Sequence, residues 1–281
     1  MKRFLVRYRV FLVLLAGLLA LFVGRTLLAA RYRIPRLDDL FTIGVLVGSL
    51  AVLIRWRRDL RRGDWAAALA LGALVGVGMG FATLFTPYPF LGVARSHLAQ
   101  GAVRGCSTAL ALLGGAAVMR QGGPVQFRAA RGEWRTFGRS VLVGLGVGAP
   151  LAALNVYALQ FTQGQSIHWQ NPLAAVLDAL QPGVVEESIY RFAFLGLLWL
   201  ALRASLPEQA AWLAGLLALL VHNYVHFDDL WLQAPWVALG MGLVMALLWG
   251  VPPTVLALRR DLDSAMAFHW LQDAARFWAG Y

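Results

Sequence analysis

Two adjacent glutamates, Glu186 and Glu187, and an arginine, Arg191, lie inside an apolar run that is long enough to span a membrane. Each ionised side chain at the centre of a spanning helix costs roughly 2.5–3.5 kcal/mol on insertion scales, so such groups are kept for their chemistry or neutralised by a partner. Glu187 and Arg191 stand four residues apart with the acid first, the favourable order for a helical ion pair. Glu186 lies about 100° away around the helix, so we expect it to be unpaired and to be a candidate general base.

Two histidines, His222 and His226, follow near the end of the next apolar run and share one helical face. Their spacing is that of a zinc-protease helix, but that motif needs a glutamate directly after the first histidine, and Asn223 stands there. The sequence therefore excludes the soluble zinc-protease motif. We expect a functional role for both histidines because a carboxylate pair lies on the preceding run. Asp228 and Asp229, at the end of this run, are expected to be solvated.

The last apolar run carries His269 and Asp273, again four residues apart. The aspartate can fix the tautomer and orientation of the imidazole, or both side chains can donate to an oxyanion if the aspartate is protonated. With a carboxylate that takes a proton from water, these groups suffice for hydrolysis of a peptide bond by activated water. No serine lies in a nucleophile motif, and there is no glycine-rich phosphate loop.

The composition predicts the elements that must hold these groups. The chain has 281 residues, 59% of them apolar and 14% charged, which is typical of a polytopic helical membrane protein. We therefore predict an all-α transmembrane bundle of eight or nine spans with its catalytic core in the C-terminal half. The predicted apolar runs cover residues 10–30, 39–55, 65–87, 101–119, 140–161, 172–202, 208–227, 234–258 and 263–280.

The formal charge of +11 does not indicate nucleic-acid binding, because the arginines cluster between the apolar runs as in loops that face anionic lipid. Their distribution predicts a multi-pass protein of the cytoplasmic membrane with its N-terminus inside. Four arginines fall on the other side in this arrangement: Arg25, Arg31, Arg33 and Arg36. The single Cys106 excludes a disulfide framework and a cysteine-based metal cage, and we expect it to be a small packing residue.

Two further patterns concern helix geometry. Glycines at four-residue steps predict close helix packing in lipid, at Gly72, Gly76, Gly80, Gly144 and Gly148. Asn171-Pro172 predicts a helix start, and Gln181-Pro182-Gly183 interrupts the apolar run three residues before Glu186. A broken helix at membrane depth is tolerated where it lines a cavity. We divide the chain into N-terminal helices with basic loops, residues 1–139, and a core, residues 140–281.

Taken in order, the three motifs resemble the CPBP family of intramembrane proteases, which is related to type II CAAX prenyl endopeptidases and to bacteriocin-processing or immunity proteins. The motifs are Glu-Glu-x-x-x-Arg at 186–191, a histidine at the end of the next helix, and His-x-x-x-Asp at 269–273; the resemblance covers residues 140–280. It implies Glu186 as the base, assisted by His222. It also implies that His269 and Asp273 form an oxyanion site, while Glu187 and Arg191 support the site.

The chain departs from the family pattern at two positions: Ala218 stands where phenylalanine is usual, and Asp273 where asparagine is usual. The resemblance implies direct water activation without a cofactor, on a peptide or protein substrate in or at the bilayer. Zinc is the other possibility, held by Glu186, His222 and His269. The alternative function is non-catalytic, either a proton-coupled transporter or an immunity-type binding partner.

Overall fold

The computed structural model describes residues 2–32, 34–82 and 90–281, and the chain there is helical apart from loops and one isolated bridge between Phe90 and Ala94. Seven helices of the described residues are long and apolar enough to cross a membrane. The protein is therefore an all-α polytopic membrane bundle, as predicted. Arg33 and residues 83–87 of the third predicted run lie outside the described residues.

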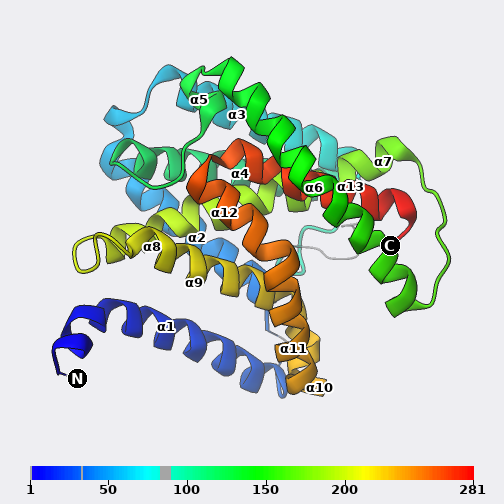
Figure 1. The fold of residues 1–281 in the computed structure, drawn as a ribbon, viewed down its shortest axis with the longest axis horizontal. Helices are drawn as coiled ribbons and strands as arrows, with labels where there is room; N and C mark the ends of the chain where they lie inside the picture. Colours follow the sequence, from blue (N-terminus) through cyan, green and yellow to red (C-terminus); the bar gives the residue numbers. More distant parts are fainter. Residues whose placement is uncertain (1, 33, 83–89) are drawn as a thin grey trace.

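The nine predicted apolar runs all contain helix (Figure 1). The helices before the site are α1 (Lys2–Ala29), α2 (Leu37–Trp56), η1 (Arg57–Asp59), α3 (Arg62–Phe81), α4 (His97–Arg120), α5 (Arg128–Arg131), α6 (Trp134–Gln163) and α7 (Pro172–Asp178). Those that follow are η2 (Gln181–Phe194), α8 (Leu195–Leu202), α9 (Ala210–Tyr224), η3 (Val225–Phe227), α10 (Asp228–Gln233), α11 (Pro235–Met245), η4 (Ala246–Gly250), α12 (Val251–Arg259) and α13 (Leu262–Ala279). The predicted runs 172–202 and 263–280 are not among the seven candidate spans, and these two carry charged site residues.

The π-helix η2 is the central element of the bundle, and all of its residues are buried. It packs against α2, α4, α9 and α13, and Figure 1 shows α13 enclosed between α6 and the other helices. Glycines permit these contacts. A Cβ on Gly115 of α4 would lie 2.3 Å from the ring of Phe192, and one on Gly183 would lie 2.5 Å from the Cα of Trp270.

The glycine repeats mark close helix contacts, as predicted. A Cβ on Gly72 of α3 would lie 2.8 Å from the carbonyl oxygen of Gly105 on α4. A Cβ on Gly144 of α6 would lie 2.3 Å from the carbonyl oxygen of Ser264 on α13. Small residues let backbones approach in this way, and the second contact holds α13, which carries His269, against α6.

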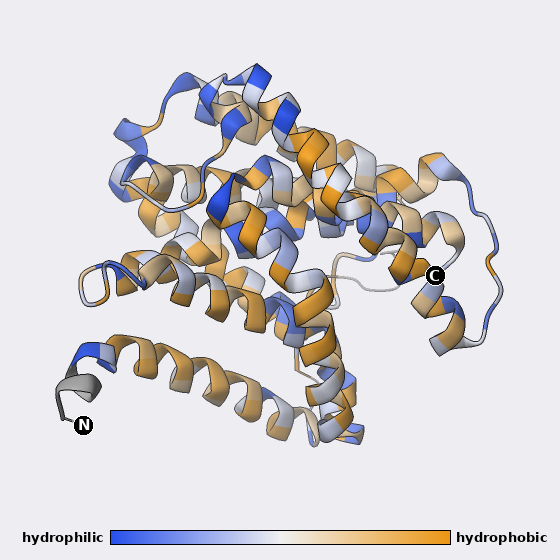
Figure 2. Cartoon of the chain, in the orientation of Figure 1, coloured by the Kyte–Doolittle hydropathy of each residue, from blue (hydrophilic) through white to orange (hydrophobic). Residues whose placement is uncertain are grey.

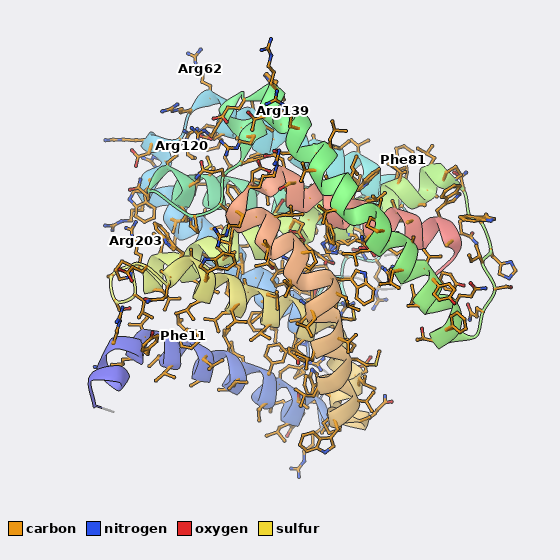
Figure 3. The ribbon with its side chains drawn as sticks, viewed as in Figure 1. Phe11, Arg62, Phe81, Arg120, Arg139 and Arg203 are labelled. Atoms are coloured by element: carbon orange, nitrogen blue, oxygen red, sulfur yellow. The ribbon has the colours of Figure 1, made fainter. Side chains whose placement is uncertain are left out.

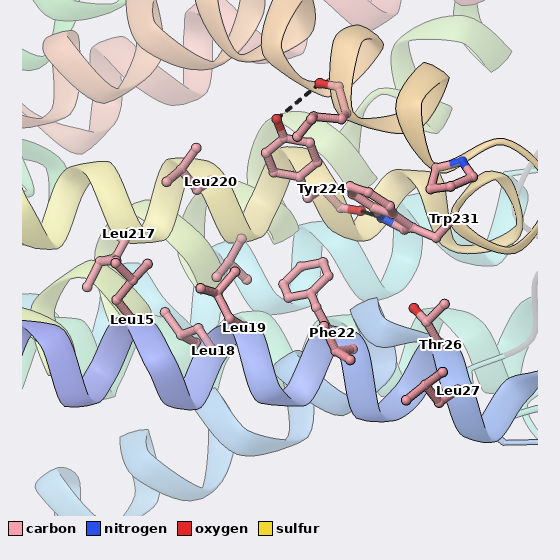
Figure 4. Close-up of a pocket in the computed structure, with 14 residues that line it drawn as sticks. Leu15, Leu18, Leu19, Phe22, Thr26, Leu27, Leu217, Leu220, Tyr224 and Trp231 are labelled. Carbon is pink, nitrogen blue, oxygen red and sulfur yellow. Dashed lines mark hydrogen bonds between the residues drawn. The ribbon is translucent and has the colours of Figure 1, made fainter.

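Helix α1 contacts the rest of the bundle least closely. Only 6% of the residues in its apolar 18-residue stretch are buried. An apolar groove of about 360 Å³ separates α1 from α9, α10 and α11 (Figure 4). Its C-terminal end is fixed by Arg25, which lies 3.1 Å from Asp228. Asp228 is buried and also accepts the backbone N–H of Leu37, so the prediction that it is solvated was wrong. The ion pair with Asp228 also explains why Arg25 lies on the side of the membrane that the arginine distribution does not favour.

The charged ends of the bundle are asymmetric. Arg62, Arg120, Arg139 and Arg203 lie toward one end, whereas Phe81 at the end of α3 lies toward the other (Figure 3). Hydrophilic residues gather at the same end, while α1 and α11 are mostly apolar (Figure 2). Cys106 is exposed on α4 and is not the packing residue that we expected, because it lies on the outer face of that helix.

Candidate active site

The local structure before Glu186 differs from a simple break. Asn171 caps α7 by accepting the backbone N–H groups of Leu173 and Ala174, which confirms the predicted helix start. At Gln181 the helix then changes from α to π rather than being interrupted. Because π-type turns are rare and are frequently found at functional sites, the π-helix that carries Glu186 marks this stretch as a site candidate.

Glu187 and Arg191 form the predicted ion pair, with 2.7 Å between Nη1 of the arginine and Oε1 of the glutamate. The side chain of Glu187 is 0% exposed and that of Arg191 is 2% exposed, so water solvates neither charge. The same Nη1 lies 2.6 Å from Nδ1 of His222 on α9. Arg191 therefore contacts a carboxylate on its own helix and an imidazole on the next one.

The contact with Arg191 sets the tautomer of His222. An arginine can only donate, so Nδ1 of His222 must accept, and the neutral ring then carries its hydrogen on Nε2. Nε2 lies 2.8 Å from Oε2 of Glu186 and donates to it. The prediction that Glu186 is unpaired was therefore wrong, because His222 is its partner. As predicted, Arg191 pairs with Glu187 and not with Glu186. The hydrogen bond from His222 orients the carboxylate of Glu186.

His269 of α13 lies between two carboxylates. Its Nδ1 is 2.7 Å from Oε1 of Glu187, and its Nε2 is 3.3 Å from Oδ2 of Asp273. Arg276 occupies the other oxygen of Asp273. Arg276 can only donate, and its positive charge beside Asp273 favours an ionised aspartate that orients His269 over a protonated aspartate that donates to an oxyanion.

The network balances its charges when each nitrogen of His269 donates to its carboxylate. The cluster then holds three carboxylates and three cations, while His222 stays neutral: Glu186, Glu187 and Asp273 against Arg191, Arg276 and His269. Glu186 itself contacts His222 rather than one of the cations. Pairing of this kind is what a cluster of charges needs in a medium of low dielectric constant.

The structure brings together the site residues that the sequence predicts on η2, α9 and α13. The ring centroids of His222 and His269 are 5.7 Å apart. Glu186 is the partly open carboxylate, since its side chain is 12% exposed and that of Glu187 is 0%. His226 lies at the open side, 38% exposed and 3.9 Å from Oε2 of Glu186. Only Glu186 of the two glutamates is thus reachable by water.

Sequence reasoning missed Tyr190, whose ring stacks on that of His222 with 4.5 Å between centroids. Its hydroxyl donates to Asp38 at the start of α2, at 2.7 Å. Asp38 and Asp39 are both buried, and two acids at the edge of an apolar run were the only signal for them. Arg276, three residues after Asp273 on the same helix, had a clearer signal in its spacing.

A metal ion has one possible donor set among the described residues, formed by Glu186, His222 and His226, whose ligand atoms lie within 4.8 Å of one another. His226 replaces His269 of the predicted set, because both ring nitrogens of His269 face carboxylates. The set fits a metal poorly. Nδ1 of His222 accepts from Arg191, so the lone pair on Nε2 becomes available to a metal only if the ring loses its remaining hydrogen.

The site consists of a partly open carboxylate, held by a neutral histidine whose tautomer is set by a buried arginine, beside a second histidine held between two acids. No protein-family model, curated protein or solved structure matches the chain.

Proposed function

We propose that the protein is an intramembrane endopeptidase of the glutamate type, which hydrolyses peptide bonds of membrane-associated or C-terminal-tail substrates. The observation that carries the proposal is the position of Glu186, a partly water-accessible carboxylate that accepts the Nε2–H of His222 within a membrane-embedded bundle. The order of the three polar motifs, and their resemblance to the CPBP family, support the same reaction.

In this reaction Glu186 takes a proton from a water molecule, and the water oxygen attacks the peptide carbonyl carbon. Glu186 then returns the proton to the leaving nitrogen as the C–N bond breaks. His222 orients the carboxylate throughout, because its Nε2–H stays on Oε2 and leaves the other oxygen to take the proton. His226, on the open side of the pair, is the group that donates to the developing oxyanion. His269 contributes only its positive charge, because both of its ring nitrogens are held by carboxylates. Asp273 orients His269.

The positive-inside rule assigns the arginine-rich end of the bundle to the cytoplasm, with the N-terminus on that side of the inner membrane. In this orientation Glu186, in the first half of η2, lies in the outer half of the membrane.

The proposal predicts a change in the ends of cellular proteins. We expect a strain that lacks the gene to accumulate uncut substrates, visible as C-terminal peptides that are absent from its parent by mass spectrometry of the membrane fraction. Re-expression of the wild-type chain should remove these peptides. Identical sets of peptide ends in the two strains would favour the transporter or binding-partner alternative.

We further propose that no metal ion is needed, since the tautomer of His222 opposes binding through Nε2. We expect a chelator such as 1,10-phenanthroline, added to the purified chain, to leave the cleavage rate unchanged within about twofold, a difference below RT in free energy. The non-chelating isomer 1,7-phenanthroline is the matched control. Inhibition by the chelator alone, reversed by added zinc, would show that a metal is required.

A further inference from the structure

Arg104 of α4 is a buried cation that the reaction described above does not use. The residue is 5% exposed, and its Nε has no hydrogen-bond partner. Within residues 2–32, 34–82 and 90–281, no carboxylate lies within ion-pair distance of it; its guanidinium lies over the ring of Phe90, 5.3 Å from the centroid. A buried charged group with an unpaired N–H is costly, so the free Nε of Arg104 points to an anion that arrives from outside the chain.

The position of Arg104 on α4 directs it toward the site. Arg104, Thr108, Ala111 and Gly115 form one stripe of the helix by their three- and four-residue spacing. Gly115 contacts Phe192 of η2, and Val118, three residues on, contacts Gly196. The two helices therefore run parallel, and the stripe faces η2.

The parallel alignment also gives the level of Arg104 along the bundle. Arg104 precedes Gly115 by eleven residues, and Glu186 precedes Phe192 by six. At the α-helical rise of about 1.5 Å per residue, the difference of five residues places Arg104 roughly 8 Å beyond Glu186 along the helix axis, toward the end of the bundle opposite the arginine-rich loops. The π-turns of η2 rise less per residue and therefore lengthen this axial offset. An extended peptide covers that distance with about two to three residues.

The surroundings of Arg104 connect it to the site. Asp39 is close enough to interact electrostatically with Arg104, and its Oδ2 accepts the backbone N–H of Leu91. The neighbouring Asp38 accepts from Tyr190, which stacks on His222. Arg104 thus lies at the same end of α2 as the aromatic and histidine side chains beside Glu186. Asp39 offsets part of its charge, which favours a monoanion over a dianion.

We infer that Arg104 binds a carboxylate of the substrate. This inference rests on the proposed function and defines its substrate class as peptides that carry a carboxylate near the cleaved bond. The guanidinium fork matches a carboxylate with two parallel hydrogen bonds. The carboxylate comes from the chain end or from an acidic side chain, and the two sources have the same chemistry at Arg104.

The test measures binding to the purified full-length chain in a neutral detergent, by the rise of its unfolding temperature with ligand concentration. The probes are N-dodecanoylglycine, which has a free carboxylate, and N-dodecanoylglycinamide, which does not. We expect the acid to bind at least about tenfold more tightly than the amide, as befits charge-assisted hydrogen bonds. Arg104→Gln should remove this preference. Arg95→Gln, at an exposed arginine near the same end, should keep it.

Equal binding of acid and amide to the wild-type chain, or an unchanged preference in Arg104→Gln, would overturn the inference. If Arg104→Gln does not fold, a diazirine-bearing acid is cross-linked to the wild-type chain instead. Labels on α4 near Arg104 support the site, and labels confined to the groove beside α1 contradict it. N-dodecanoyl-aspartic acid α-amide separates the two sources, since its only carboxylate is on a side chain.

Binding is independent of cleavage in this test, so the inference and the proposed function fail separately. Glu186→Gln should bind the acid as the wild-type chain does. A chain that binds the acid through Arg104 but cleaves nothing would refute the endopeptidase and leave the carboxylate site standing.

Discussion

Replacement of Glu186 by glutamine is expected to lower kcat/KM for peptide cleavage by roughly 10²- to 10⁴-fold, which is the usual contribution of a positioned general base. The amide has the shape of the carboxylate and can still accept the Nε2–H of His222, so no buried donor loses its partner. It cannot take a proton from water. The measurement is the appearance of the new peptide end, with purified variant and wild-type chain compared at equal folded concentration.

The matched control for this variant is Asp229→Asn, which neutralises an exposed acid three residues after His226. We expect its activity to be that of the wild-type chain, which separates loss of the base from loss of one negative charge. Cleavage by Glu186→Gln at a near wild-type rate, with normal protein abundance, would refute the assignment of Glu186 as the base.

The fold and half of the site could be predicted from local sequence. Hydropathy identifies all nine helical regions because a backbone in lipid must satisfy its hydrogen bonds within each segment. The pair Glu187–Arg191 follows from helical spacing alone. The contacts of Gly72 and Gly144 follow from the rule that only small residues let helices approach closely.

Contacts between helices could not be predicted in the same way. The contact of Arg191 with His222, 31 residues away, depends on the axial position of α9 relative to η2. A shift of one helical turn would remove the contact. Asp228 looked solvated because it ends a helix, yet Arg25 from the other end of the chain buries it. Neither partner carries a local signal, since the pairing arises from packing.

The π-helix had an ambiguous signal. Gln181-Pro182-Gly183 indicates a disturbance, and an interruption and a change of helix type fit it equally well. The change of type widens the turn, which places Glu186 toward His222 and Glu187 toward His269 and Arg191. This geometry separates one water-accessible carboxylate from one that is completely buried.

The second large effect is expected from Arg191→Ala, which should lower the free energy of unfolding by about 3–5 kcal/mol, the usual cost of removing one partner of a buried ion pair. Two groups lose a partner at once. Glu187, which is 0% exposed, keeps only His269, and Nδ1 of His222 has nothing to accept from. Freed from Arg191, His222 can adopt the other tautomer, in which Nε2 no longer donates to Glu186. We therefore expect low abundance of the folded chain, measured in membranes and by its unfolding temperature.

Two further variants separate stability from tautomer control. In Glu187→Leu with Arg191→Met, the two opposite buried charges are removed together, so folded abundance should recover in part relative to Arg191→Ala. The recovery is partial because Nδ1–H of His269 loses its acceptor. Activity should not recover, because His222 still lacks its donor. Arg191→Lys keeps a charge beside Glu187 but lacks the rigid guanidinium, so we expect near-normal abundance with a clear loss of cleavage. Normal abundance of Arg191→Ala would contradict the buried pair, and normal cleavage by the double variant would contradict the role of Arg191 in setting the tautomer of His222.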